Sequence, residues 1–183
     1  REVLRRTDAI LDFAELADLN GHYIRKSTPA EVKSRLQDAL PEMENGAATK
    51  AALDHLGWDR LDAVLPALME RAKTLKDIPA GAAFLLATRP LKFDDKAVKI
   101  LDADARATLK ALAADFTAAA AWDVATLDGV VRAFAEKSGK KLGQIAQPLR
   151  AALTGTTVSP PVGDMMVALG RGEALARIAD HAS

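Results

Sequence analysis

Apolar residues recur along the chain at helical spacing, and no strand-like alternation persists for five residues. The strongest stripe lies within residues 59–71, where apolar positions are three or four apart: Leu61, Val64, Leu65, Leu68 and Met69. This spacing brings the five side chains onto one face of a helix. Similar stripes recur in residues 109–116 and 127–134. The pattern therefore predicts an all-α fold.

Capping and helix-breaking residues predict where several of these helices begin and end. Residues 28–31, Thr-Pro-Ala-Glu, combine a capping threonine, a proline in the first turn and the glutamate of a capping box. Asp59 and Thr126 are expected to cap the helices that carry the first and third stripes. Pro66 lies inside the first stripe and predicts either a kink or an early helix start. Gly139 is expected to end the helix of the third stripe.

A polar, turn-like segment at residues 88–95 interrupts the helical pattern and contains Pro90. We place a boundary in this segment, between two consecutive helical-bundle subdomains. The first spans residues 27–93 and the second spans residues 94–183. Residues 1–26 are interpreted as a lead-in to the first subdomain.

Composition agrees with a helical globular protein and limits the classes of function. The 183 residues are 49% hydrophobic and 4% aromatic, a mixture that favours closely packed helices over a sheet. Lys plus Arg equals Asp plus Glu at 25 each, so nucleic acid would have to be bound by a local patch and not by overall charge. The absence of cysteine excludes disulfides and thiolate metal sites, and His22, His55 and His181 are too scattered to suggest a metal cluster.

The distribution of apolar residues also bears on the location of the protein. No apolar run approaches the roughly 20 residues needed to span a bilayer. The first residues are charged and contain no signal-peptide core. We therefore expect a soluble cytoplasmic protein without membrane contact.

The most informative stretch is residues 140–171, which contains two proline-marked helix starts and a polar bend between them. If residues 143–153 are helical, one face holds Ile145, Leu149, Ala152 and Leu153, and a polar face holds Gln147, Arg150 and Thr154. Pro148 lacks an N–H group, so we expect it in the first turn of its helix. The helix would then start near Gln147, with Gln147 exposed at its entry.

The polar residues of this stretch have the donors and acceptors needed to bind RNA. Arg150 offers a planar fork and a stacking face, and Gln147 offers both a donor and an acceptor. Such groups recognise unstacked bases in single-stranded RNA loops. Ser159 is expected to cap a second helix that follows Pro160. The free N–H groups at the start of that helix would favour a phosphate or the acceptor edge of a base. The alternative is that Arg150 is a solvated helix residue and that Ser159 and Pro160 only begin a helix.

Residues 141–155 have the sequence Lys-Leu-Gly-Gln-Ile-Ala-Gln-Pro-Leu-Arg-Ala-Ala-Leu-Thr-Gly. This sequence closely resembles the C-terminal anticodon-binding region of bacterial glutamyl-tRNA synthetases. The resemblance extends over nearly the whole chain, through residues 19–25, 71–77, 122–141, 159–162 and 169–171. It implies an all-α fold of the class I synthetase anticodon-binding type, in which two helical subdomains hold the anticodon loop. Residues 1–26 would be the tail of the stem-contact segment that precedes them.

The resemblance also implies a set of site residues. Arg150 falls on the Pro-Leu-Arg position that contacts an anticodon base in the family. Ser159, Pro160 and Val162 fall on the elbow that borders the anticodon. Arg71 matches the arginine that reads the last anticodon base in glutamate-specific members, where its fork would favour C over U and reject glutamine tRNA.

Several residues depart from the family pattern or allow two interpretations. Gln147 stands where some members have an aromatic residue, and Gly163 stands where an apolar residue is common. The match to Arg71 could slip to Lys73. A basic cluster near the elbow is either a solvated helix end or a set of phosphate contacts, and it consists of Lys137, Lys140 and Lys141.

Two motifs of the family's catalytic domain, of the His-Ile-Gly-His and Lys-Met-Ser-Lys-Ser types, are absent from the chain. We therefore expect recognition without catalysis and no cofactor, since ATP and Mg would be used only by the missing catalytic domain. The expected partner of this monomer is a tRNA anticodon stem-loop, that of glutamate tRNA. The alternative function is an all-helical protein–protein interaction domain without an RNA role.

Overall fold

The computed structural model describes residues 13–182, and all of its regular elements within that range are helices, which confirms the all-α prediction. An N-terminal lobe contains α2 (Phe13–Lys26), α3 (Pro29–Ala39), the 3-10 helix η1 (Leu40–Glu42), α4 (Gly46–Leu56), α5 (Asp59–Asp62), α6 (Leu65–Arg71), α7 (Asp77–Gly81) and α8 (Ala83–Leu86). A C-terminal lobe contains α9 (Asp95–Ile100), α10 (Ala103–Thr117), α11 (Val124–Ser138), α12 (Leu142–Thr154), α13 (Val162–Leu169) and α14 (Arg171–Ala179).

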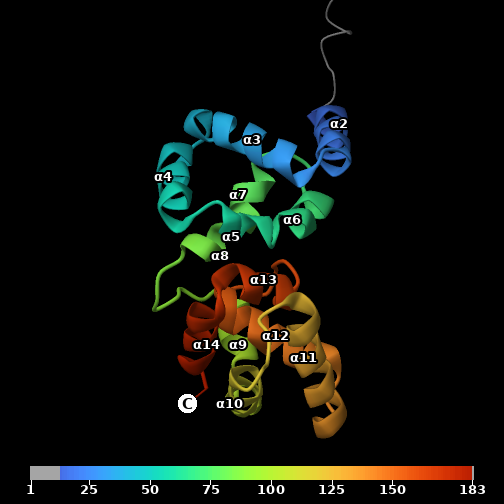
Figure 1. The fold of residues 1–183 in the computed structure, drawn as a ribbon, viewed down its shortest axis with the longest axis vertical. Helices are drawn as coiled ribbons and strands as arrows, with labels where there is room; N and C mark the ends of the chain where they lie inside the picture. Colours follow the sequence, from blue (N-terminus) through green and yellow to red (C-terminus); the bar gives the residue numbers. More distant parts are fainter. Residues whose placement is uncertain (1–12, 183) are drawn as a thin grey trace, which may run out of the picture.

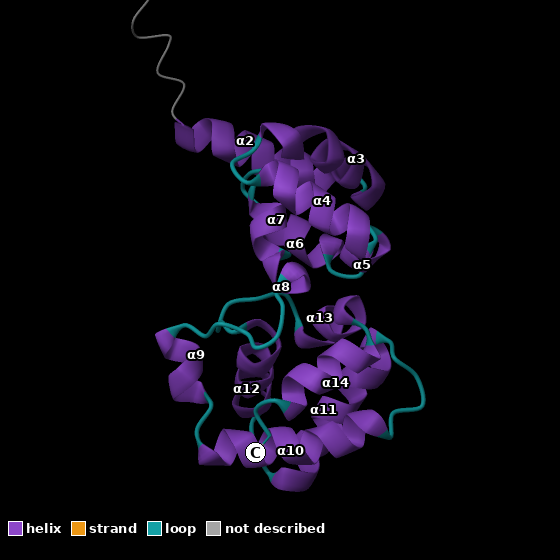
Figure 2. Cartoon of the chain, turned by 90° about the vertical axis from the view of Figure 1, so that its left-hand side faces the viewer, coloured by secondary structure: helices purple, strands orange, loops and turns teal. Residues whose placement is uncertain are grey.

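The two lobes are stacked along the long axis of the molecule, with α13 at their junction (Figure 1). Helix α13 belongs to the C-terminal lobe but packs against α5 of the N-terminal lobe. The view turned by 90° shows the same stacking, with the linking loop running beside α8 (Figure 2). The predicted limits of the subdomains, residues 27–93 and 94–183, stay a prediction about how the chain divides. Residues 1–12 of the predicted lead-in lie outside the described residues.

Local capping explains the start of α3 as predicted. The backbone N–H of Thr28 donates to Glu31 Oε2 at 2.7 Å, and the N–H of Glu31 donates to Thr28 Oγ1 at 3.3 Å. Asp59 was expected to cap its helix, and this is wrong, because it is the first residue of α5 and follows Trp58. Pro66 lies in the first turn of a separate helix, α6, so the early start is correct and the kink is not.

Burial of the first apolar stripe agrees with its spacing. All five of its side chains are at most 7% exposed: Leu61, Val64, Leu65, Leu68 and Met69. Full burial of one such side chain stabilises a fold by about 1.5–3 kcal/mol. The stripe is therefore the core of the N-terminal lobe, even though it is divided between α5 and α6.

Helix α12 is the centre of the C-terminal lobe, because it packs against α9, α10, α11, α13 and α14. Its predicted apolar face is fully buried, with no exposed area at Ile145, Leu149, Ala152 and Leu153. The same is true of Ala151, on a side of the helix that the pattern did not assign to the core. From Ile145 onward no residue of α12 is exposed, because five other helices surround this part of it.

The predicted start of α12 is wrong by about one and a half turns. The helix begins at Leu142, where the side-chain Oε1 of Gln144 accepts the N–H of Lys141 at 2.9 Å. Pro148 is inside the helix, where it forfeits one backbone hydrogen bond. Packing on all sides compensates for that loss. Gln147 is consequently half-buried, and its Oε1 has no hydrogen-bond partner in the described part of the chain.

The two ends of α11 are set by capping residues, of which the sequence predicted one correctly. Thr126 does not cap α11, because Asp123 does so by accepting the N–H of Thr126 at 2.8 Å. Gly139 ends α11 with a φ of 69°, as expected of a left-handed capping residue. No helix of the described chain is both long and apolar enough to cross a membrane.

Candidate nucleic-acid interface

The elbow, residues 155–161, connects α12 to α13 and lies at the junction of the lobes. Gly155 has a φ of 78° and ends α12. Its carbonyl accepts the N–H of Asp94 at 3.0 Å, and a Cβ added to it would lie 2.0 Å from the carbonyl oxygen of Lys92. Only glycine allows this close approach. The elbow is therefore held against the loop that links the two lobes.

Two threonines give the elbow its shape. Thr154 Oγ1 donates to the carbonyl of Arg150 at 2.8 Å and accepts the N–H of Thr156 at 3.1 Å. Thr156 Oγ1 donates to the carbonyl of Val158 at 3.0 Å. The side chain of Val158 is 84% exposed at the tip. The hydroxyl groups of Thr154 and Thr156 thus bond to the nearby backbone, while the tip of the elbow presents an apolar side chain to the solvent.

Arg71 and Ser159 are 88 positions apart in the sequence but meet across the junction. Arg71 is the last residue of α6 and is exposed, and its Nη1 donates to the carbonyl of Ser159 at 2.8 Å. The predicted capping role of Ser159 is wrong, because its Oγ donates to the carbonyl of Pro160 and the helix N-cap is Pro161. Ser159 instead offers its backbone carbonyl to the other lobe.

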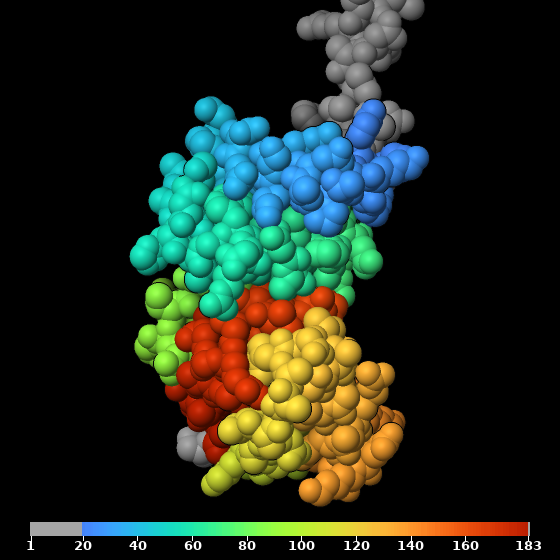
Figure 3. All heavy atoms as spheres, in the orientation of Figure 1, coloured from blue at the N-terminus to red at the C-terminus, as the bar shows by residue number. Residues whose placement is uncertain are grey.

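A pocket of about 310 Å³ lies at this contact, with walls from both lobes. Arg71, Ser159 and Pro160 line it, and its apolar lining includes Leu68 and Phe84. In the space-filling view, the red surface of the C-terminal residues lies directly under the N-terminal lobe (Figure 3). The structure therefore unites three of the predicted site residues in one pocket.

A second hollow, of about 280 Å³, includes two further predicted residues, Arg150 and Val162, in its lining. Arg150, Pro161 and Val162 line it together with Arg132 of α11. The guanidinium of Arg150 is half-buried and has no hydrogen-bond or ion-pair partner among the described residues. Pro160 lines the first pocket and Pro161 the second, so the elbow separates the two.

The basic cluster is not part of this arrangement. Lys137 lies in the last turn of α11 and Lys141 precedes α12, whereas the elbow follows the other end of α12. A helix of 13 residues is about 20 Å long, which separates the cluster from the elbow. Lys140 Nζ also forms an ion pair with Asp104 at 2.5 Å. A phosphate role for the cluster stays a prediction, but it would act at a distance from the elbow.

Carboxylates border the elbow on the side of α13. Burial raises the pKa of Asp164, and the nearby carboxylates of Asp128 and Glu70 raise it further. Gly163 allows this packing, because an added Cβ would lie 2.8 Å from Asp128 Oδ1. That contact explains why a bulky residue is absent at 163. The carboxylates on this side of the elbow would repel a phosphate group.

The model of the anticodon binding domain family matches residues 48–182, which include the N-terminal lobe from α4 onward, the C-terminal lobe and the elbow. The chain belongs to this family of anticodon-binding domains. It is 46% identical over 177 residues to the glutamate–tRNA ligase of Bradyrhizobium sp. strain ORS 278, and 48% identical over 185 residues to glutamate–tRNA ligase 2 of Parvibaculum lavamentivorans. These alignments cover 97% and 100% of the chain.

This anticodon-binding domain spans only 37% and 36% of the length of those two relatives. It is homologous to the C-terminal part of glutamyl-tRNA synthetases. Its fold is similar to part of a glutamate tRNA ligase from Elizabethkingia meningosepticum, with a TM-score of 0.69 and 22% identity over 89% of this chain and 30% of that one. The glutamate–tRNA synthetase of Elizabethkingia anophelis gives a TM-score of 0.58 at 25% identity.

Sequence reasoning missed two residues that shape the interface of this anticodon-binding domain. Thr156 organises the elbow, and its signal was the Thr-Gly-Thr-Thr run at residues 154–157. Arg132 enters the second hollow from α11. No local signal marks Arg132, because the side of α11 that faces the hollow is decided by how α11 packs on α12.

Proposed function

We propose that the chain recognises the anticodon stem-loop of glutamate tRNA, as the tRNA-reading part of a glutamate–tRNA ligase. One observation carries the proposal: two arginine side chains, Arg71 and Arg150, reach separate hollows on either side of a single elbow. Adjacent hollows, each with a planar fork of donors, suit successive bases that are unstacked from a loop. The domain would act by recognition, as a cytoplasmic monomer without a cofactor of its own.

The wall chemistry supports bases as the recognised groups. The pocket at Arg71 has apolar walls that include Leu68, Phe84 and Pro160, against which a flat base can lie. Its volume of about 310 Å³ is at the lower end of small-molecule sites. The carboxylates near Asp164 disfavour phosphate on the adjoining surface.

The donors of Arg71 support selection at one base. Arginine has five N–H donors and no acceptor, and a single donor of Arg71 is used by Ser159. The remaining donors can pair with neighbouring acceptors on a base edge. On its Watson–Crick edge cytosine presents two such acceptors, O2 and N3, whereas uracil and guanine place an N–H donor on that edge. This difference supports cytosine as the base read by Arg71.

Titration with fluorescently labelled stem-loops tests the proposed function. The glutamate anticodon stem-loop is expected to bind, with an affinity that falls as salt rises and that is lost when only the anticodon bases are changed. A hairpin with the same stem and a scrambled loop is the control. Equal binding to both hairpins would reduce the interface to a basic patch, and absence of RNA binding would favour the protein–protein interaction alternative.

A further inference from the structure

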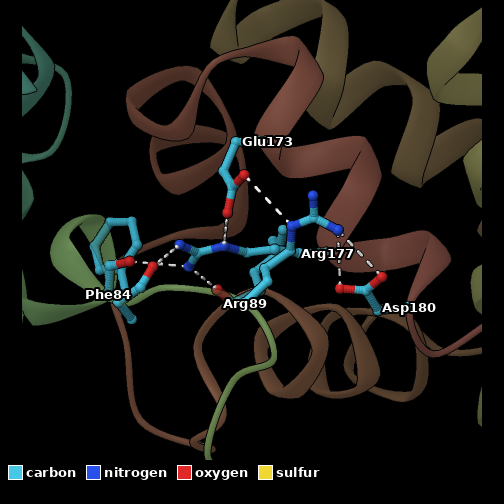
Figure 4. A network of polar contacts seen from close by, with 7 residues as sticks. Phe84, Arg89, Glu173, Arg177 and Asp180 are labelled. Carbon is cyan, nitrogen blue, oxygen red and sulfur yellow. Dashed lines mark hydrogen bonds and ion pairs between the residues drawn. The ribbon is translucent and has the colours of Figure 1, made fainter.

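Arg177 of α14 is a buried arginine with only 1% of its surface exposed. Its Nε donates to Glu173 Oε1 at 2.7 Å, and its Nη1 donates to the carbonyls of Phe84 and Leu153 at 2.9 and 2.7 Å. Its Nη2 donates to the carbonyl of Ala87 at 2.7 Å. A buried charge is tolerated only when it is paired and hydrogen-bonded in this way. Figure 4 shows the guanidinium at the centre of this network.

The three carbonyls belong to two parts of the molecule that must be placed relative to each other. Phe84 and Ala87 lie in and directly after α8, where the N-terminal lobe ends. Leu153 lies in the last turn of α12, two residues before the elbow begins. Carbonyls at helix ends lack helical donors. One guanidinium therefore donates to carbonyls at the end of the N-terminal lobe and to a carbonyl at the end of the helix that leads into the elbow.

A second arginine strengthens this network from the linking loop. Glu173 lies between Arg177 and Arg89, whose Nε is 3.6 Å from Glu173 Oε2 (Figure 4). Nη1 of Arg89 is 3.2 Å from a carboxylate oxygen of Asp180. The side chain of Arg89 is 40% exposed, so water and salt screen its contribution. Arg177 is thus the principal member of the network.

The other side-chain contacts across the junction are weaker or exposed. Arg60 Nη1 donates to the carbonyl of Ala168 at 3.3 Å. The contact of Arg71 with Ser159 is a single bond at the surface. A base that entered the pocket would compete for the donors of Arg71. That contact is therefore a poor candidate for holding the lobes during recognition.

We propose that Arg177 is the positioning residue that fixes the two lobes so that Arg71 and the elbow form one RNA site. This inference rests on the proposed function. Arg177 does not touch the RNA. Its loss leaves both arginines of the interface intact but frees the N-terminal lobe, with Arg71, to move relative to the elbow.

Spin labels can test the positioning role directly, because the chain has no native cysteine. Ala48 in α4 and Ala133 in α11 are exposed and lie in different lobes, so both are replaced by cysteine and labelled. The wild-type background is expected to give one narrow distance distribution, and Arg177→Met a clearly broader one. Leu112→Ala, a core change in α10 away from the junction, is the control and is expected to lower Tm without broadening. An unchanged distribution in Arg177→Met overturns the inference.

The affinity of each variant for the glutamate stem-loop then tests whether the relative placement of the two lobes affects RNA recognition. Arg177→Met is expected to raise Kd about tenfold, equivalent to about 1.4 kcal/mol, while Leu112→Ala stays near the wild-type value. Arg177→Lys retains the charge without the fork and is expected to give an intermediate Kd. A Kd for Arg177→Met equal to that of the wild type, despite a broadened distribution, also overturns the inference.

Two further outcomes have defined meanings. If Arg177→Met does not fold, Glu173→Gln replaces it, since Gln keeps an acceptor oxygen for Arg177 but removes the charge. A smaller broadening and a smaller rise in Kd are then expected, and no change in either contradicts the positioning role. If the wild type fails to distinguish the stem-loops, the proposed function fails, whereas the distance measurement still decides whether Arg177 holds the lobes.

Discussion

Arg177 and Arg71 both cross the junction between the lobes, and they differ in burial and in the number of hydrogen bonds that they make. Arg177 is buried, and it makes one bond to a carboxylate and three to carbonyls. Arg71 is exposed and makes one bond, to the carbonyl of Ser159. A buried arginine that is hydrogen-bonded within the protein stabilises the fold, whereas an exposed arginine with most of its donors free is available to a ligand. Burial and hydrogen bonding together therefore indicate which arginine is used for which purpose.

The largest expected effect is on the free energy of unfolding, and it follows from replacing the buried Arg177. Arg177→Met leaves three carbonyls without their donor and leaves Glu173 with the ion pair to Arg89. Each buried acceptor that loses its partner costs about 1–3 kcal/mol, so the loss of all three should exceed that of any other change considered below. Urea unfolding of the chain measures this loss. Arg132→Met, the same substitution at an exposed position of α11, should change the free energy of unfolding by no more than about 0.5 kcal/mol. Equal effects of the two changes would remove the distinction.

Gly155 tests how firmly the elbow is held beside these arginines. Gly155→Ala places a Cβ against the carbonyl of Lys92 at a φ of 78°, and we expect a loss of about 1–3 kcal/mol of stability. The matched control is Gly143→Ala in the first turns of α12, where no atom lies within 4 Å of the new Cβ. That change should stabilise the chain by about 0.5–1 kcal/mol. Thermal unfolding of both variants should therefore shift Tm in opposite directions.

Local physics accounts for the features that the sequence predicted well. The capping box at Thr28 and the buried stripe from Leu61 to Met69 depend on residues a few positions apart. Pro148 shows the limit of such reasoning: a proline normally belongs in the first turn, yet burial of α12 on all sides holds it in the helix interior. Competition between a local preference and tertiary packing cannot be resolved from one segment.

The candidate site could be predicted residue by residue but not as an arrangement. Arg150 and Ser159 are identified from the helix pattern and the family resemblance, and Arg71 from the resemblance alone. Their division between two hollows depends on the stacking of the lobes. Arg177 follows Glu173 by four positions, a spacing typical of an ion pair on a helix surface. Its burial arises only because α8 and α12 meet at α14. Long-range packing of this kind leaves no mark in the local pattern.

Arg150 extends the comparison to an arginine that is half-buried but whose guanidinium has no partner among the described residues. Arg150→Ala is expected to weaken binding of the glutamate stem-loop by about 1–3 kcal/mol, the range of one good base contact. The free energy of unfolding should stay within about 0.5 kcal/mol of the wild-type value. Arg35→Ala, at an exposed position of α3, controls for the loss of one positive charge. Equal weakening by both variants would assign Arg150 only a general electrostatic role.

Arg71 has the smallest expected effect, and that effect is on specificity. Its one bond is at the surface, so Arg71→Gln should cost less than about 1 kcal/mol of stability. Glutamine carries both a donor and an acceptor, so it no longer rejects bases that present an N–H on the edge being read. The ratio of affinities for glutamate and glutamine anticodon stem-loops should therefore fall, by about tenfold if one discriminating contact is lost. Lys73→Gln is the decisive comparison, since Lys73 is the alternative match two residues away and is also exposed. If the ratio changes with Lys73 and not with Arg71, the base is read by Lys73 and not from the pocket at Ser159. The contrast between buried Arg177 and exposed Arg71 would then no longer describe how this junction recognises RNA.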